Sequence, residues 1–372
     1  MKIYFDGAIY SWQKGGGIYK YFDEILNYCG KDKGLETTLL MPTPIHKTPD
    51  IKNVSIKYLT PLRKVPGFIF EPVRKIMSPI NRLFFEKYFK RVDAGVFHST
   101  YYTTYKNLRI PQVLTVHDMT YEKFPNFFSS TGAKRFMANK KKCLMRADSI
   151  ICVSEATKKA LLNLYEIEER KISVIYHGIS ESFLRETVKY KNILLDKPYF
   201  LFVGNRRDYK NFNFFIEAFS KWNKNKNYNL LTIGGGKLSE EEILLINKLS
   251  LNKQVKHLGS VEEKYLKDIC QRSEAFVFPS LDEGFGLPII EAISSKTIVI
   301  ASNIEVFKEI GENMLIYFDP KETDSIINAL EKSTLKETGP EELEKRAKYV
   351  VDKFSWNKCA KETIEIYKKT TK

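Results

Sequence analysis

The sequence has few cysteines and no long apolar run, and both absences narrow the classes of protein that it can encode. Its five cysteines are scattered through 372 residues without a C-x-x-C pair. This pattern indicates free thiols in a reducing compartment and no zinc site. No run of about 18 apolar residues occurs, so no membrane-spanning helix is predicted. The N-terminal MKIYFDGAIY carries Asp6 inside its apolar run, which favours a first strand over a secretion signal. We therefore expect a cytoplasmic protein.

Acidic side chains are scarce in the first half of the chain. Residues 1–180 hold 29 Lys and Arg but 16 Asp and Glu, a surplus of 13, whereas residues 181–372 hold 31 and 29, a surplus of 2. This excess of basic residues in the first half indicates an anionic partner. Alternatively, the basic residues serve only to keep the protein soluble. The stretch 61–92 interleaves Arg and Lys with Phe, Ile and Leu, which fits an anionic bilayer surface or an ordinary amphipathic helix with a solvated basic face. No zinc-finger spacing, RNP-type motif or basic zipper occurs, so nucleic acid is not an expected partner.

Short apolar strands alternate with helical segments along the whole chain, which predicts parallel sheets covered on both faces. The series breaks near 181–197 and restarts with the strand KPYFLFVGN. We therefore predict an α/β architecture with two Rossmann-like, doubly wound domains, residues 1–185 and 186–354, facing each other across a cleft. A closing helix is expected at 355–372. In such sheets ligands bind outside the carboxyl ends of the strands.

Two motifs of the first half follow predicted strands. GGGIYKY, from Gly15 onward, places a glycine-rich loop before a helix, where free amides favour an anion. Its spacing is not G-x-G-x-x-G, because Tyr21 stands where the motif has a small residue, and a flexible turn is the alternative. VLTVHDM places His117 and Asp118 directly after a strand. A histidine there can hydrogen-bond a sugar hydroxyl or move a proton, or it can be structural.

Cations and carboxylates follow two strands of the second half. VGNRRDYKNF places Arg206, Arg207 and Lys210 between a strand and a helix start, which predicts a clamp for a diphosphate, with a solvated loop as the alternative. In FPSLDEGFGLPIIEA, Glu283 precedes a glycine loop and Glu291 lies in the helix that follows. The two carboxylates can bind hydroxyls of two different sugars without a metal ion.

Amides between the two carboxylates complete this segment. Phe285, Gly286 and Leu287 form the end of the loop and the start of the helix, and their amides are expected to point into the cleft. One short stretch therefore offers a carboxylate, a set of amide donors and a second carboxylate.

E-G-F-G-L-P-x-x-E resembles the signature of the retaining GT-B glycosyltransferases of family 4, the glycosyl transferases group 1. The segments GGGIYKY, VFHSTYYTT, VLTVHDMTY, ICVSEATK, VIYHGI, FLFVGNRRDYKN, LTIGGG and HLGSV follow in the family's order. The resemblance covers almost the whole chain. It implies an acceptor-binding first domain and a nucleotide-sugar-binding second domain. The implied reaction transfers a sugar from a nucleotide diphosphate sugar to a glycan or lipid-linked acceptor, with retention and without a metal or other cofactor.

The resemblance also implies roles for single residues. Glu283 would contact hydroxyls of the donor sugar, Glu291 would contact the ribose, and His117 would contact the donor sugar near the reacting carbon. The HLGSV turn at 257–261 would border the nucleobase. The leaving diphosphate would be met by amides and cations, namely Gly16, Gly17, Lys210 and either Arg206 or Arg207. Asn205 stands where many members have arginine, and Tyr209 replaces another, so the identity of the second cation stays open.

The family's usual roles suggest a setting in surface polysaccharide or lipopolysaccharide synthesis, with the enzyme peripheral on the inner face of the plasma membrane. A guanosine-linked mannose donor is our interpretation. Three alternatives remain open: a nucleotide-sugar epimerase on a similar scaffold, a dehydrogenase that uses GGGIYKY, and an inactive sugar-nucleotide binding protein.

Overall fold

A computed structural model describes residues 1–46, 49–60, 65–191 and 195–371, and the chain forms two compact units. The first unit is Met1–His177 together with Trp356–Lys372, and the second is Gly178–Ser355. The division therefore falls at 177/178, whereas the sequence placed it at 185/186, and the C-terminal helix is part of the first unit. Residues 192–194, at the end of the expected break, lie outside the described residues.

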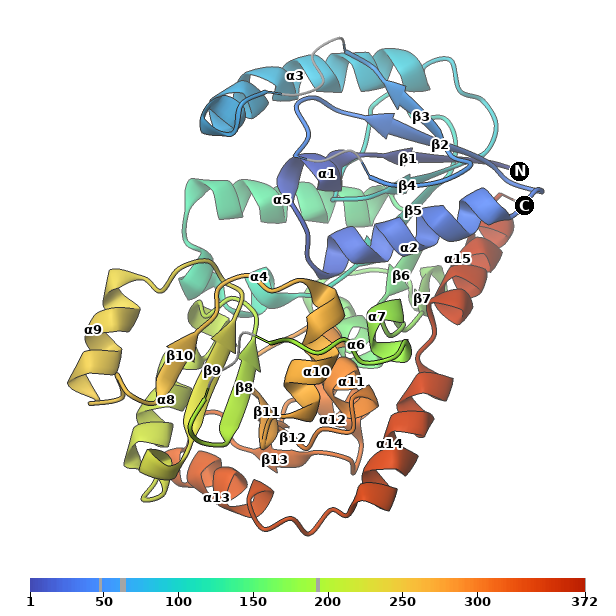
Figure 1. Cartoon of the computed structure of the whole chain (residues 1–372). Coiled ribbons are helices and arrows are strands. Elements are labelled where there is room, and N and C mark those ends of the chain that lie inside the picture. Colours follow the sequence, from blue (N-terminus) through green and yellow to red (C-terminus); the bar gives the residue numbers. More distant parts are fainter. Residues whose placement is uncertain (47–48, 61–64, 192–194, 372) are drawn as a thin grey trace. The chain divides into compact units, whose positions relative to one another are not determined.

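The first unit is built on a seven-stranded parallel sheet (Figure 1). Its strands are β1 (Lys2–Asp6), β2 (Glu36–Met41), β3 (Ser55–Tyr58), β4 (Val96–Ser99), β5 (Gln112–Val116), β6 (Ser149–Cys152) and β7 (Ile172–Val174). The spatial order is β3-β2-β1-β4-β5-β6-β7, so the direction of winding reverses between β1 and β4. The central strands β4 and β5 are buried at every position, as expected for a parallel sheet covered on both faces.

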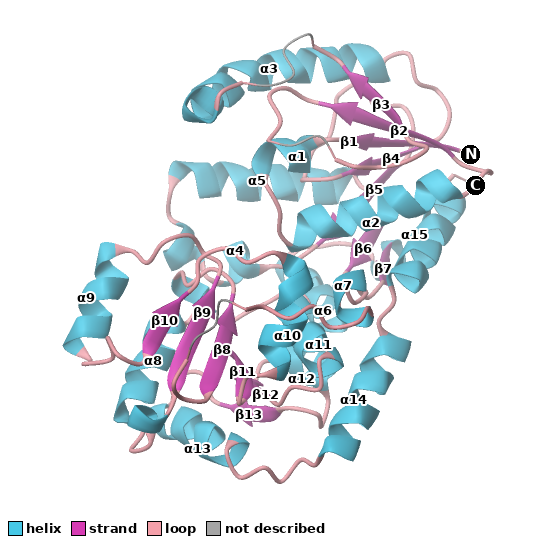
Figure 2. Cartoon of the chain, viewed as in Figure 1, coloured by secondary structure: helices cyan, strands magenta, loops and turns pink. Residues whose placement is uncertain are grey.

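Helices cover both faces of this sheet (Figure 2). They are α1 (Ala8–Trp12), α2 (Gly17–Lys31), α3 (Phe70–Phe89), α4 (Thr120–Lys123), α5 (Thr131–Arg146), α6 (Glu155–Leu164) and α15 (Trp356–Thr370). Phe97 of β4 packs against α3. Leu114 of β5 packs against α5 and α6. The alternate side chains face α2 and α15. Ser154 caps α6 by accepting a hydrogen bond from the Thr157 amide, as its position before the helix predicted.

The C-terminal helix α15 is fastened to the first unit by a buried polar chain. His98 of β4 lies between two hydroxyls, with Nδ1 2.6 Å from Tyr367 Oη and Nε2 2.9 Å from Thr115 Oγ1. The same Thr115 hydroxyl is 3.1 Å from Tyr21 Oη on α2. Burial lowers the pKa of His98 to about 3, so its imidazole is neutral and each nitrogen has a hydroxyl partner.

The second unit repeats the architecture with a six-stranded parallel sheet. Its strands are β8 (Tyr199–Val203), β9 (Asn229–Ile233), β10 (Val255–His257), β11 (Ala275–Phe278), β12 (Val299–Ser302) and β13 (Ile316–Phe318). The spatial order is β10-β9-β8-β11-β12-β13. Because the winding reverses between β8 and β11, the carboxyl ends of these two neighbours form the switch point, the place where sheets of this kind bind ligands.

Helices also cover both faces of the second sheet. They are α7 (Glu181–Leu184), α8 (Phe212–Lys221), α9 (Glu240–Lys248), α10 (Leu266–Gln271), α11 (Leu287–Ser294), α12 (Glu305–Gly311), α13 (Thr323–Ser333) and α14 (Pro340–Lys353). One face holds a core in which Phe202, Phe215 and Trp222 join the sheet to α8. The core makes the sheet a rigid base for the loops at its carboxyl edge.

Candidate active site

The candidate site of the second unit lies at the switch point of its sheet, at the carboxyl ends of β8 and β11. Lys210, after β8, and Glu283, after β11, form an ion pair between Nζ and Oε1, with side chains only 15% and 14% exposed. Ser280 Oγ donates to the same carboxylate oxygen at 2.8 Å. The Leu281 amide donates to the Tyr209 carbonyl at 2.7 Å, which joins the two loops directly. The structure therefore brings together two residues that the sequence separates by more than seventy positions.

Glu291 lies one turn inside α11, next to this pair of loops. Gly286 is the residue before the helix and has φ +97°, a conformation that favours glycine, and Pro288 lies in the first turn as expected. Phe285 is buried and packs edge-on against Phe354 at 5.7 Å, so its ring is part of the core of the second unit. Ser180 Oγ donates to Glu291 Oε1 at 2.6 Å. Sequence reasoning missed Ser180 because it belongs to the connection after the first unit.

The two arginines of the β8 loop have different surroundings. Arg206 is buried, and its Nε donates to Glu242 Oε1 at 2.8 Å while Nη1 donates to the Gly234 carbonyl at 2.6 Å. Arg207, the next residue, is exposed. The prediction that one of them meets a diphosphate therefore favours Arg207, since the guanidinium of Arg206 already has protein partners.

His117 follows β5 in the first unit and is nine-tenths buried. Among the residues that the structure describes, neither ring nitrogen has a hydrogen-bond partner, and the ring packs against Tyr21 at 5.2 Å and Phe22 at 5.9 Å. Burial, reinforced by His177, lowers the pKa of His117 well below its usual value, so the imidazole is neutral. A buried polar ring without a protein partner is rare, and it is able to bind a ligand hydroxyl.

The turn that carries His117 is held by a buried lysine. Lys140 of α5 is 1% exposed, and its Nζ donates to the Asp118 carbonyl at 2.7 Å and to Glu122 Oε2 at 3.0 Å. Tyr165 Oη donates to the other oxygen of Glu122 at 3.2 Å. No sequence motif pointed to Lys140, because its role comes only from the folded contact between α5 and the turn.

Gly16 and Gly17 open α2 at the end of the first glycine-rich loop. Gly16 has φ +120° and precedes the helix, and both residues are exposed. The first amides of this 15-residue helix have no partner within the helix, so they are available to an anion. The structure confirms a glycine loop at a helix start, and the binding of a diphosphate there stays a prediction.

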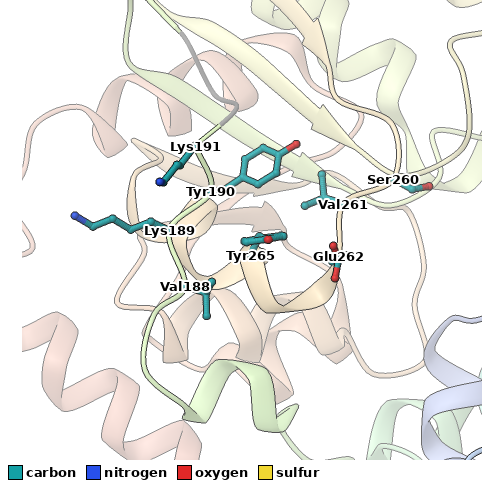
Figure 3. Close-up of a pocket in the computed structure, with 8 residues that line it drawn as sticks. All are labelled: Val188, Lys189, Tyr190, Lys191, Ser260, Val261, Glu262 and Tyr265. Carbon is teal, nitrogen blue, oxygen red and sulfur yellow. The ribbon is translucent and has the colours of Figure 1, made fainter.

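A pocket of about 480 Å³ lies beside the turn that was predicted to border a nucleobase (Figure 3). Ser260 and Val261 of that turn line one side, and Tyr190 and Tyr265 contribute aromatic rings with centroids 5.2 Å apart. Aromatic rings can contact the face of a flat heterocycle, and the hydroxyl of Ser260 is a hydrogen-bonding group.

Among residues 1–46, 49–60, 65–191 and 195–371, no group of three or more His, Cys, Asp or Glu is arranged to hold a metal ion. All five cysteines are free and buried, and burial raises the pKa of the Cys29, Cys143 and Cys152 thiols to about 12. No helix in the described part of the chain has the length and apolar character needed to cross a bilayer.

The comparison with protein families identifies both halves of the chain. The model for Glycosyltransferase Family 4 matches residues 15–183, and the model for Glycosyl transferases group 1 matches residues 185–350. The chain belongs to the family-4 glycosyltransferases. The resemblance of EGFGLPxxE to a family-4 signature is thereby confirmed as to the family. This family assignment argues against the epimerase and dehydrogenase alternatives.

Individual relatives agree with this family. The chain is 32% identical over 222 residues to the O-antigen chain mannosyltransferase RfbU of Salmonella typhimurium, which covers 59% of this chain and 60% of that protein. It is 24% identical over 266 residues to the O-antigen chain mannosyltransferase B of Escherichia coli, covering 69% and 70%. The chain thus spans less than two thirds of RfbU's length.

Solved structures confirm the GT-B fold class. A sucrose-phosphate synthase from Thermosynechococcus elongatus has a TM-score of 0.76 at 19% identity, covering 99% of this chain and 98% of its own. WaaG, described as a glycosyltransferase involved in lipopolysaccharide biosynthesis, has a TM-score of 0.71 at 14% identity, covering 98% and 99%. HepE from Anabaena, solved with UDP and glucose, has a TM-score of 0.72 at 15% identity, covering 99% and 100%.

Proposed function

We propose that this glycosyltransferase moves a sugar from a nucleotide diphosphate sugar to a glycan or lipid-linked acceptor, with retention of anomeric configuration and without a metal ion. The observation that carries the proposal is the Lys210–Glu283 pair at the β8/β11 switch point, beside Glu291 on α11. A cation for the diphosphate, from the loop after β8, and a carboxylate for sugar hydroxyls, from the loop after β11, meet at this switch point.

The roles of the residues follow from the charge that each offers. Lys210 and Arg207 neutralise the diphosphate as it leaves, and the amides that open α2 at Gly16 and Gly17 add partial positive charge. Glu283 accepts hydrogen bonds from hydroxyls of the donor sugar, and Glu291 accepts them from the ribose. His117, neutral and without a protein partner, hydrogen-bonds the transferred sugar and does not attack it.

Retention is assigned to attack on the face from which the diphosphate departs. The bond between the anomeric carbon and the phosphate oxygen breaks, and its electron pair stays on the diphosphate. The acceptor hydroxyl then bonds to the same face of the oxocarbenium-like carbon, and its proton passes to the departing phosphate oxygen. This step uses no protein nucleophile. It requires only that charge on the diphosphate be stabilised.

The donor and the pathway are suggested by relatives. Two of them are named O-antigen chain mannosyltransferases, and WaaG is described as a glycosyltransferase involved in lipopolysaccharide biosynthesis. We propose a hexosyltransferase of surface polysaccharide or lipopolysaccharide synthesis, with mannose from a guanosine donor as the first sugar to test. The UDP complex of HepE makes uridine donors the necessary comparison.

A thermal-shift screen tests the donor site. UDP, GDP and their sugars are added with and without EDTA to the wild type and to Glu291→Ala. We expect stabilisation by one base, unchanged by EDTA and lost in the variant. An inactive binding protein is stabilised in the same way but does not release sugar from the donor or transfer it, so turnover of the stabilising donor is measured in parallel. No stabilisation by any nucleotide would contradict the proposal.

The acceptor is proposed to be reached at an anionic membrane surface, and α3 is the element that supports this. Its inward face is buried, with Phe85 parallel to Tyr105 at 5.1 Å. The opposite face exposes a stripe at helical spacing, in which Ile76 is 66% and Leu83 is 71% exposed. Ile80 is also exposed between them. Residues 61–64 of the predicted basic stretch lie outside the described residues.

Basic side chains flank the exposed stripe of α3. Lys75 and Lys87 are exposed, and Arg82 is 57% exposed with Glu86 3.7 Å away. An apolar stripe bordered by lysines matches a surface that is anionic at the headgroups and apolar below them. Each inserted Ile or Leu contributes about 1 kcal/mol when half-buried. Each lysine near an anionic leaflet contributes about 1 kcal/mol more.

Vesicle sedimentation tests this part separately. The wild type is mixed at low salt with phosphatidylcholine vesicles, with and without roughly a third phosphatidylglycerol. We expect binding only to the anionic vesicles, and a loss of about thirtyfold in Ile76→Ser/Leu83→Ser, since two side chains at about 1 kcal/mol each are removed. The matched control is Ile243→Ser/Leu244→Ser on α9, which removes two exposed apolar side chains elsewhere. Equal binding by the α3 variant and the control would contradict the membrane proposal.

A further inference from the structure

Arg206 is fully engaged within the protein, although it stands in the cationic loop after β8. Its side chain is 2% exposed, and all three guanidinium nitrogens donate hydrogen bonds. Nε bonds Glu242 Oε1 at 2.8 Å, Nη1 bonds the Gly234 carbonyl at 2.6 Å, and Nη2 bonds the Lys237 carbonyl at 3.1 Å. A diphosphate could reach this guanidinium only after these bonds had broken.

The loop after β9 is shaped around that guanidinium. The three glycines at 234–236 all have positive φ, +86°, +70° and +73°. A Cβ on Gly235 would lie 2.8 Å from Arg206 Nη1, so no larger residue fits there without moving the arginine. The third glycine's carbonyl lies 2.7 Å from His257 Nε2, and the first glycine's amide donates to the Gly259 carbonyl at 2.7 Å. The loops after β8, β9 and β10 thus form one hydrogen-bonded block.

Glu242 completes the block from α9. Its side chain is 12% exposed, and Oε2 accepts from the Ser239 amide at 2.7 Å while the Ser239 hydroxyl accepts from the Glu242 amide at 3.1 Å. The carboxylate therefore caps the helix and neutralises Arg206 at the same time. Because both charges are nearly buried, removal of either leaves the other without compensation.

We propose that Arg206 is a positioning residue that locks the loops after β8, β9 and β10 together, and that Arg207 is the arginine that meets the diphosphate. The inference rests on the proposed function of the site. The β8 loop continues from Arg206 to Lys210, whose amide donates to the Arg207 carbonyl at 2.8 Å. Fixing the start of this loop fixes the lysine that pairs with Glu283.

The two roles predict different responses to substitution. Arg206→Gln, Glu242→Gln and the double variant are compared with Arg207→Gln for binding of UDP and GDP by calorimetry at several salt concentrations. Melting temperatures without nucleotide are measured in parallel. For a positioning pair, the two single variants lose affinity to a similar degree, on the order of tenfold, and the double variant is no weaker than either.

Salt dependence separates the two arginines. Arg207→Gln is expected to lose affinity on the order of tenfold, with a weaker dependence of Kd on salt and an unchanged melting temperature, because an exposed ionic contact to phosphate is lost. The Arg206 and Glu242 variants keep the salt dependence of the wild type but melt lower. Arg206→Lys restores the melting temperature in part, since it keeps the charge opposite Glu242.

Three results would overturn the inference. Wild-type affinity in Glu242→Gln, together with a weaker salt dependence in Arg206→Gln, would make Arg206 a phosphate ligand. Unchanged affinity in both variants would remove the positioning role. Unchanged affinity in Arg207→Gln would remove Arg207 from the site. Absence of nucleotide binding in the wild type would instead refute the proposed function, while the shared loss of melting temperature in the Arg206 and Glu242 variants would still show the structural pair.

Discussion

The ion pair between Lys210 and Glu283 leads to the prediction that one substitution, Glu283→Gln, strengthens nucleotide binding but slows sugar transfer. In the free protein the lysine neutralises the carboxylate, and both side chains are about 15% exposed. A bound diphosphate competes for the same ammonium group, so the pair has to loosen before Lys210 meets the phosphates. Glu283→Gln removes this competition and keeps an oxygen that accepts the Ser280 hydroxyl at 2.8 Å in the wild type.

The size of the effect follows from the worth of a partly exposed ion pair. Such a pair contributes about 1 kcal/mol, which is roughly a fivefold change in an equilibrium constant. We therefore expect Glu283→Gln to bind UDP or GDP, whichever the wild type binds, about fivefold more tightly. Sugar transfer should fall by about a hundredfold, because the carboxylate no longer meets the donor sugar in the transition state.

Calorimetry with the nucleoside diphosphate and a turnover assay with the full donor measure the two parts separately. Glu365→Gln is the matched control, since Glu365 of α15 also pairs with a lysine, Lys368 at 2.8 Å, but the two side chains are 58% and 49% exposed. The control should change neither quantity. Weaker nucleotide binding in Glu283→Gln, or transfer within a few-fold of the wild type, would refute the reasoning.

Three further predictions concern stability and donor geometry. Ser180→Ala should raise the KM for the donor by a few-fold with little change in kcat, since it removes only the hydroxyl that donates to Glu291 at 2.6 Å; a larger loss of kcat than of affinity would contradict it. Gly286→Ala should cost about 1–2 kcal/mol and lower the melting temperature by a few degrees, because φ is +97° there; Gly339→Ala, at φ −73°, is the control. The stability gap between the wild type and His98→Gln should shrink as pH falls from 7 to 5. Burial lowers the pKa of His98 to about 3, so the stability of its neutral form is complete above pH 6.5 and is lost on acidification. A constant gap in melting temperature would contradict this assignment.

The fold was predictable because its signal is local and repeated. Strands such as β11, with AFVF, are apolar on both faces, and polar residues follow at the carboxyl edge. Alternation with helices then fixed a parallel sheet in each half. The division of the chain was less predictable, since α15 belongs to the first unit through His98 and Tyr367, a contact between residues 269 positions apart.

The site was predictable to the extent that its residues share a short motif. Glu283 and Glu291 were visible together because one loop and one helix carry both. Ser180 and Lys140 were not visible, since each acts through hydrogen bonds to residues that are far from it in the sequence. No pattern of spacing reports such a contact.

Arg206 and Arg207 show most clearly what the sequence alone cannot predict about the site, because they are neighbouring residues of the same type in the same loop. From sequence position alone, either arginine could be the one that contacts the diphosphate. Burial separates them: a residue that donates to the carbonyls of 234 and 237 and to Glu242 is part of the scaffold, whereas its exposed neighbour is free of those bonds. An arginine beside a phosphate site is thus assigned by the partners of its own nitrogens, and charge at the right place in the sequence is not sufficient.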